Sequence, residues 1–145
     1  MANKNIAEIM NMNSDDDPDR KQVEDGEWLL RFTSYRPDNV KNEKNTPFVR
    51  FNVKPIGKYD AEGNVEEALN YDNVQHDVWM SDDSRPIAKG FFQKSLGIET
   101  KGKGWREIYE EAIGLEVRGV IKVQLEGKNK DRPTPRIVKF LNLNT

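Results

Sequence analysis

The spacing of apolar residues changes along the chain from the period of a strand to that of a helix and back. This order of changes is the feature that most limits the folds available to the chain. Apolar and polar residues alternate, as in strands, over three segments between Gly26 and Met80. Helical spacing follows over 84–97 and 105–113, and alternation returns over 117–125 and 137–141. The sequence therefore predicts three strands, two helices and two strands, in that order.

The first three strands are expected at Trp28–Tyr35, Phe48–Ile56 and Val74–Met80, with turn residues at 36–39 and 60–64. In the second strand, one face is wholly apolar and is expected to point to the core. Its other face carries Phe48, Arg50, Asn52 and Lys54.

Helix signals surround the two helical segments. Asp83 or Ser84 can cap the first, which ends at Gly97, and the second runs from Trp105 to Ile113. In the strand that follows, Gly119 would permit sharp bending.

Five short strands with a helical insertion between the third and fourth match the plan of an OB-fold, a small Greek-key barrel that binds oligonucleotides. We therefore expect a mainly β, OB-fold-like barrel over residues 26–145. A five-stranded sheet packed on helices is the competing architecture, because periodicity does not separate the two. Residues 1–25 have few large apolar groups and include the acidic run Ser14–Asp19, which predicts a mobile arm with a short helix at Ile6–Met12.

Composition narrows the function classes. The length of 145 residues suits one domain, and Val, Leu, Ile and Phe number 34, just above what a folded core requires. There is no Cys and one His, His76, which excludes disulfide scaffolds, thiolate sites and His-rich metal sites. We expect no cofactor, no enzymatic activity, no membrane association and a cytoplasmic location, since no signal-like or membrane-spanning segment is present.

The formal net charge of −2 conceals opposite segments. Residues 1–27 carry −5 and residues 60–83 carry −8, whereas residues 28–59 carry +5 and residues 84–145 carry +6. Two basic blocks that alternate with two acidic ones are compatible with a polyanion-binding surface and equally with a soluble protein of mixed charge.

Two groups of residues are candidates for binding nucleic acid. On the first three strands, aromatic rings could stack on bases while neighbouring cations follow the phosphates. Between the last two strands, a basic loop with two prolines could close over a bound strand and release counterions. The strand candidates are Arg31, Tyr35, Phe48, Arg50, Lys54 and Trp79, and the later ones are Lys122, Lys128, Lys130, Arg132 and Arg136.

The alternatives are structural. The outward cations can be ordinary solvated charges, Trp79 can belong to the core, and the basic loop can be a solvated hairpin tip. Acidic residues at 72–83 could bind Mg²⁺ in a small nuclease, although they lie in one stretch without fixed spacing. His76 alternates with Val74 and Val78, which favours a packed histidine over a general base.

Several local features resemble bacteriophage single-stranded-DNA-binding proteins of the OB-fold type. These are Gly26-Glu27-Trp28, the strand Phe48–Val53, the helix end Phe91-Phe92 with Leu96-Gly97, the helix Trp105–Gly114 and the strand Val117–Glu126. The resemblance covers about residues 26 to 141. It implies non-sequence-specific binding of single-stranded DNA during phage replication or recombination, with replication or recombination proteins, or further copies of the chain, as possible partners. The alternatives are a phage protein-interaction or regulatory module that does not bind DNA, and the Mg²⁺-dependent nuclease.

Overall fold

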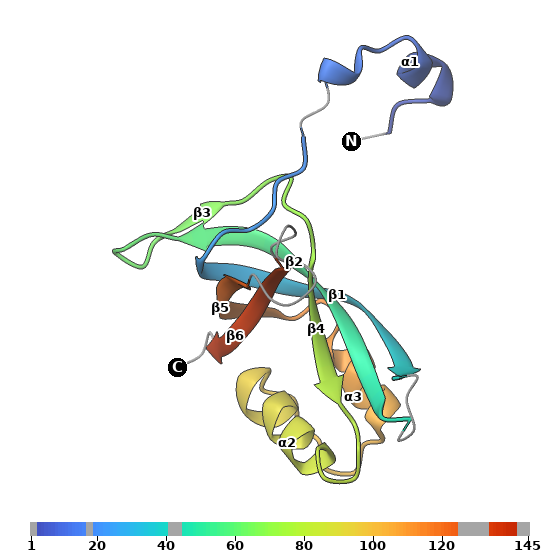
Figure 1. The fold of residues 1–145 in the computed structure, drawn as a ribbon, viewed down its shortest axis with the longest axis vertical. Coiled ribbons are helices and arrows are strands. Elements are labelled where there is room, and N and C mark those ends of the chain that lie inside the picture. Colours follow the sequence, from blue (N-terminus) through green and yellow to red (C-terminus); the bar gives the residue numbers. More distant parts are fainter. Residues whose placement is uncertain (1–2, 17–18, 41–44, 125–133, 142–145) are drawn as a thin grey trace.

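The computed structural model describes residues 3–16, 19–40, 45–124 and 134–141. Within these ranges, six strands form one antiparallel sheet (Figure 1). The order in the sheet is β3–β2–β1–β5–β6, and β4 pairs with β2. The predicted β-rich class is confirmed, and the number of strands is six because a short strand forms after the turn at 60–64. The strands are β1 (Gly26–Asn39), β2 (Pro47–Tyr59), β3 (Val65–Glu67), β4 (Val74–Trp79), β5 (Glu116–Gln124) and β6 (Thr134–Leu141).

The helices lie close to the predicted positions. α1 spans Ile6–Met10, α2 spans Arg85–Gly90 and continues as a π-helical turn, η2, at Phe91–Ser95, and α3 spans Trp105–Ala112. α2 and α3 lie together at one end of the sheet (Figure 1). In the ranges that the structure describes, no helix combines the length and the apolar character needed to cross a bilayer.

β1 is longer than predicted, because residues 36–39 continue the strand instead of forming a turn. Pro37 pairs with Val49, and Asn39 pairs with Pro47. A proline is tolerated here because β5 pairs with β1 only from Gly26 to Arg31, so the second edge of β1 needs no amide donor at Pro37. Pro55 in β2 also lies between the residues paired with β4 and those paired with β3.

The core lies between the inner face of the sheet and the helices. Trp28, Leu30 and Phe32 of β1 are fully buried. Val49, Phe51 and Val53 of β2 are buried beside them, as the alternation predicts. The helices contribute further buried residues, namely Ala88, Phe92, Ile108, Tyr109 and Ala112.

β4 and β6 lie next to each other without pairing in the described part of the sheet. We call this boundary, between Val74–Trp79 and Thr134–Leu141, the β4–β6 seam. The sheet is therefore open along the seam, and each of the two strands keeps an edge that is not paired with another described strand.

The segment that precedes β1 is only partly separate from the domain. Lys21 forms a parallel bridge with Tyr71, and Val23 is only 2% exposed within the core. The Asp25 carboxylate accepts a 2.6 Å hydrogen bond from the Val123 amide. Residues 20–25, which the sequence assigned to the mobile arm, thus pack against the sheet, whereas α1 stands away from it (Figure 1).

Gly119 tests how closely β5 packs on β1. A Cβ atom there would lie 2.7 Å from Leu30 Cδ1 and 3.3 Å from Ile137 Cγ2, so it would displace core side chains. We expect Gly119→Ala to lower the free energy of unfolding by about 1–3 kcal/mol, as overpacking does. Urea denaturation measures this change.

Gly90 provides the matched control. It is helical, and a Cβ atom there would have no neighbour within 4 Å. Gly90→Ala should leave stability unchanged or raise it by up to about 1 kcal/mol. Equal effects of the two substitutions would contradict the packing argument.

Candidate nucleic-acid interface

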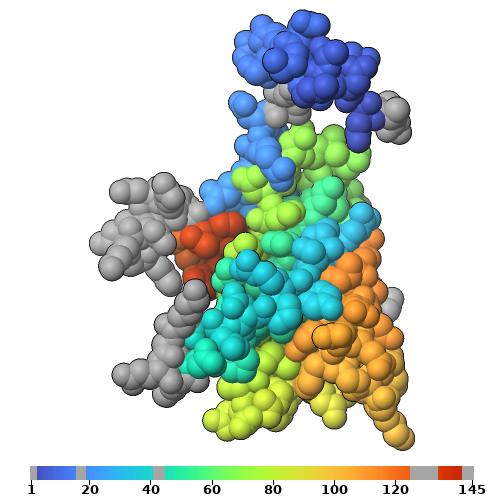
Figure 2. Space-filling view, turned by 90° about the vertical axis from the view of Figure 1, so that its right-hand side faces the viewer, coloured from blue at the N-terminus to red at the C-terminus, as the bar shows by residue number. Residues whose placement is uncertain are grey.

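The outer face of β1, β2 and β4 is the side of the sheet opposite the core. Cross-strand pairing places Phe48 beside Trp79, Arg50 beside Asp77, and Asn52 beside Gln75. On the other side of β2, Arg36 pairs with Arg50, and Ser34 pairs with Asn52. β1 and β2 are open to view on the surface in Figure 2. This face therefore combines aromatic, cationic and amide side chains.

Three of the predicted site residues touch one another. The ring centroids of Phe48 and Trp79 are 5.5 Å apart, and the Arg50 guanidinium carbon lies 5.4 Å from the Phe48 centroid. Phe48 is only 8% exposed, whereas Trp79 is 46% exposed. Phe48 thus packs beside the tryptophan, and the exposed part of the indole keeps a surface on which another flat ring can stack.

Arg50 is held by Asp77. Its Nε and Nη2 atoms donate hydrogen bonds of 2.8 and 2.9 Å to the two carboxylate oxygens. The hydrogen bonding that Asp77 accepts from Arg50 has the largest effect on the pKa of the guanidinium and raises it, so the side chain stays charged. A bidentate pair fixes the guanidinium plane. It also compensates the positive charge of Arg50, which would otherwise attract a phosphate more strongly.

A polar cavity of about 320 Å³ adjoins this pair at the β4–β6 seam. Arg50, Asn52 and Gln75 line it from β2 and β4. Thr134, Pro135 and Arg136 line it from β6. The fold thus brings Arg136 to the same cavity as Arg50, although the two residues are far apart in the sequence.

The other predicted cations are more dispersed. Lys54 is exposed on β2 opposite Arg31, and Arg31 forms a 3.6 Å ion pair with Glu116. Lys122 pairs with Arg136 across β5 and β6. Lys128, Lys130 and Arg132 lie outside the described residues.

Tyr35 lies on the core side of the sheet. The register of β1 against β2 shifts between Phe32 and Ser34, which reverses the faces of the following residues. The Tyr35 ring contacts Phe51 and Tyr109, at centroid distances of 6.1 and 5.5 Å. Burial, with a smaller contribution from Tyr35, raises the pKa of Tyr109 to about 12, which keeps that phenol neutral.

The same shift places Arg36 on the outer face, where sequence reasoning missed it. The residues 36–39 were predicted as a turn because Pro, Asp and Asn favour turns. In the structure Arg36 is exposed and directly opposite Arg50. Only the hydrophobic residue beyond this segment, Val40, could have suggested a longer strand.

His76 lies on the inner side of β4, as its alternation with valines predicts. Its ring centroid is 5.4 Å from that of Phe91 and 4.8 Å from that of Phe140. Burial lowers the pKa of His76 to about 4, against a smaller opposing effect of Asp77. The imidazole is therefore neutral at physiological pH and packs as an aromatic ring.

Three of the four acidic residues considered for Mg²⁺ binding are paired with arginines. Asp72 pairs with Arg20, and Asp77 pairs with Arg50. Asp82 forms an ion pair with Arg85. Within the described ranges, no three or more His, Cys, Asp or Glu side chains gather as a metal site would require.

Comparison with models of known protein families and with curated proteins finds no match for this chain. The resemblance to phage single-stranded-DNA-binding proteins stays an expectation.

The pKa of His76 predicts a pH-dependent stability. Because the folded pKa of about 4 is below the ordinary 6.5, the unfolded chain binds a proton more readily. The stability that the neutral His76 contributes to the folded state is fully present above pH 6.5 and is lost as the pH falls toward 4. Between pH 7 and 4.5 we expect a loss on the order of 2–3 kcal/mol from this group.

Urea unfolding of the wild type and of His76→Phe at both pH values measures this contribution. The phenylalanine keeps the ring packing and does not titrate, so the variant should lose less stability on acidification. Carboxylate titration is common to both proteins and cancels in the difference. Identical losses would contradict the assignment.

Proposed function

We propose that the chain binds single-stranded DNA, without sequence preference, across the outer face of β2 and β4. The observation that carries this proposal is the half-exposed Trp79 ring, which rests on Phe48 next to Arg50. An exposed ring offers a stacking surface to any base, and stacking does not depend on base identity. Duplex DNA does not present free base faces to such a platform.

The charges on this face support a backbone-tracking role. Arg36 is exposed on β1 across from Arg50, Lys54 is exposed further along β2, and Arg136 lines the same polar cavity as Arg50. Phosphates bound along these cations would release counterions, so the affinity should fall as salt rises. Asn52 and Gln75 between them can hydrogen-bond bases or sugars.

The strand connections support an OB-fold-like barrel as the scaffold. β1 pairs with both β2 and β5, β2 pairs with β4, and β5 pairs with β6. Closure of the β4–β6 seam would complete a ring of five strands, β1, β2, β4, β6 and β5. The short strand β3 lies outside this ring and pairs with the end of β2. An OB-fold binds oligonucleotides on the second and third strands of that ring, which here are β2 and β4.

A titration of fluorescently labelled single-stranded and duplex oligonucleotides at several salt concentrations tests the proposal. Preference for the single strand, with an affinity that falls steeply with salt, is expected. No binding at low salt would refute the proposal. Incubation of the same oligonucleotides with Mg²⁺ tests the nuclease alternative, because cleavage would reveal it.

Trp79→Ala is expected to weaken binding of the single strand. Loss of one stacked base costs about 1–3 kcal/mol, which corresponds to roughly 5- to 150-fold in affinity. Trp79→Phe keeps a stacking ring and should lose less. Fluorescence anisotropy measures both variants, and an equal loss in the two would show that stacking is not the reason.

Asp77→Asn is expected to tighten binding. The change removes a negative charge from the face and frees Arg50 from its bidentate partner, so one more cation can meet a phosphate. The salt dependence should steepen by about one phosphate contact.

Asp82→Asn is the control, because Asp82 pairs with Arg85 next to α2 instead of on the outer face. It should leave the affinity nearly unchanged. Equal responses to the two substitutions would indicate a general effect of net charge and would contradict a specific role for Arg50.

A further inference from the structure

Exposed apolar side chains concentrate in two places. Of the eight large hydrophobic residues that are exposed in the described structure, three lie on α1 and three line one cavity at the β4–β6 seam. Those on α1 are Ile6, Ile9 and Met10, and those at the cavity are Trp79, Ile87 and Val138. Apolar surfaces gathered in this way are typical of contacts with another protein surface.

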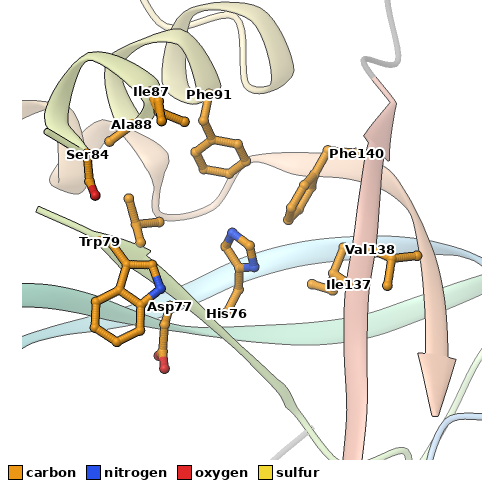
Figure 3. Close-up of a pocket in the computed structure, with 11 residues that line it drawn as sticks. His76, Asp77, Trp79, Ser84, Ile87, Ala88, Phe91, Ile137, Val138 and Phe140 are labelled. Carbon is orange, nitrogen blue, oxygen red and sulfur yellow. The ribbon is translucent and has the colours of Figure 1, made fainter. Parts of the chain in front are cut away.

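The cavity has a volume of about 340 Å³ and lies between α2, β4 and β6. Figure 3 shows the rings of His76, Phe91 and Phe140 facing it, with Ile87 and Ala88 on the α2 side. Ile87 is 76% exposed at its rim. The lining is mostly apolar and is suited to aliphatic side chains rather than to a charged ligand.

α1 has a matching apolar face. Ile6, Ile9 and Met10 are spaced three and four residues apart, so they share one side of the helix. α1 has no buried residue, although Asn5 caps its first turn by accepting a 2.8 Å hydrogen bond from the Glu8 amide. A helix of five residues is too short to be stable alone in water and needs a surface to dock on.

The direction of the chain takes α1 away from its own cavity. Lys21 runs parallel to Tyr71, which leads into β4, and Arg20 forms a 2.6 Å ion pair with Asp72. Toward the N-terminus from Lys21, the chain therefore runs in the direction opposite to β4. The cavity lies beside the C-terminal half of β4, at His76–Trp79. α1 accordingly projects beyond the other end of the sheet (Figure 1).

We propose that α1 of one copy docks in the seam cavity of a second copy, in a reciprocal exchange of arms. Each copy presents one apolar helix and one apolar cavity, so a twofold arrangement satisfies both at once. The polar cavity with Arg50 and Arg136 continues the seam and can face Asp15, which follows α1. The proposal does not depend on DNA binding.

Sedimentation velocity of the full chain over a range of concentrations tests the exchange. The wild type should form dimers, and Met10→Asp in the arm and Ile87→Asp at the cavity should each raise the dimer dissociation constant about tenfold or more. Both residues are more than 70% exposed, so these changes should not unfold the domain, which circular dichroism checks. Leu69→Asp is the control, because Leu69 is 62% exposed and belongs to neither surface.

A mixture of the two variants provides the sharper test. Met10→Asp keeps an intact cavity, and Ile87→Asp keeps an intact arm, so one of the two contacts can form in the mixed pair. The mixture should therefore associate more tightly than either variant alone. A monomeric wild type, a dimer that resists both substitutions, or a crosslink between α1 and the cavity within a single chain would each overturn the proposal.

Discussion

The long antiparallel pairing of β1 with β2 is the constraint on which the rest of the structure depends. It runs from Trp28 to Asn39 and carries two register shifts. Each shift exchanges the faces of the residues beyond it, so the bulge after Phe32 turns Tyr35 inward and Arg36 outward. The register of β1 against β2 therefore decides both which residues face the core and which residues face the candidate interface. A different register would change both together.

The candidate interface is built from compensated groups. Phe48 is buried beside Trp79 and Arg50, and the charge of Arg50 is compensated by Asp77 in a bidentate pair. This arrangement holds the side chains in fixed orientations, which lowers the entropic cost of binding, but it reduces the attraction for phosphates. In the proposed complex Trp79 would stack on a base, and the exposed Arg36 and Lys54 would contact the phosphates. This surface fits the modest overall charge of the chain.

The open β4–β6 seam connects the two proposals. At one end it offers a polar cavity with Arg50 and Arg136, and at the other an apolar cavity with exposed Ile87 and Val138. Unpaired strand edges are usually protected in soluble proteins. Occupation of the apolar end by the arm of a second copy would cover Ile87 and Val138 together with Trp79, which lines the same cavity. Assembly and DNA binding would then compete for the Trp79 ring.

The sequence by itself determined the type and order of the main elements, the inward face of β2 and the packed position of His76 in β4. It could do so because periods of two and of 3.6 residues reflect local backbone geometry. The sequence also placed Phe48 and Arg50 on the outward face of the second strand but left Trp79 between the core and the binding surface, and the structure brings these three together. Only the tertiary structure decided the extension of β1 through Pro37, the inward turn of Tyr35 and the meeting of Arg136 with Arg50. Each of these three features, a bulge, a proline at an unpaired edge and a cavity between distant strands, depends on which strands are neighbours in the sheet. Hydrophobic periodicity carries no information about strand neighbours.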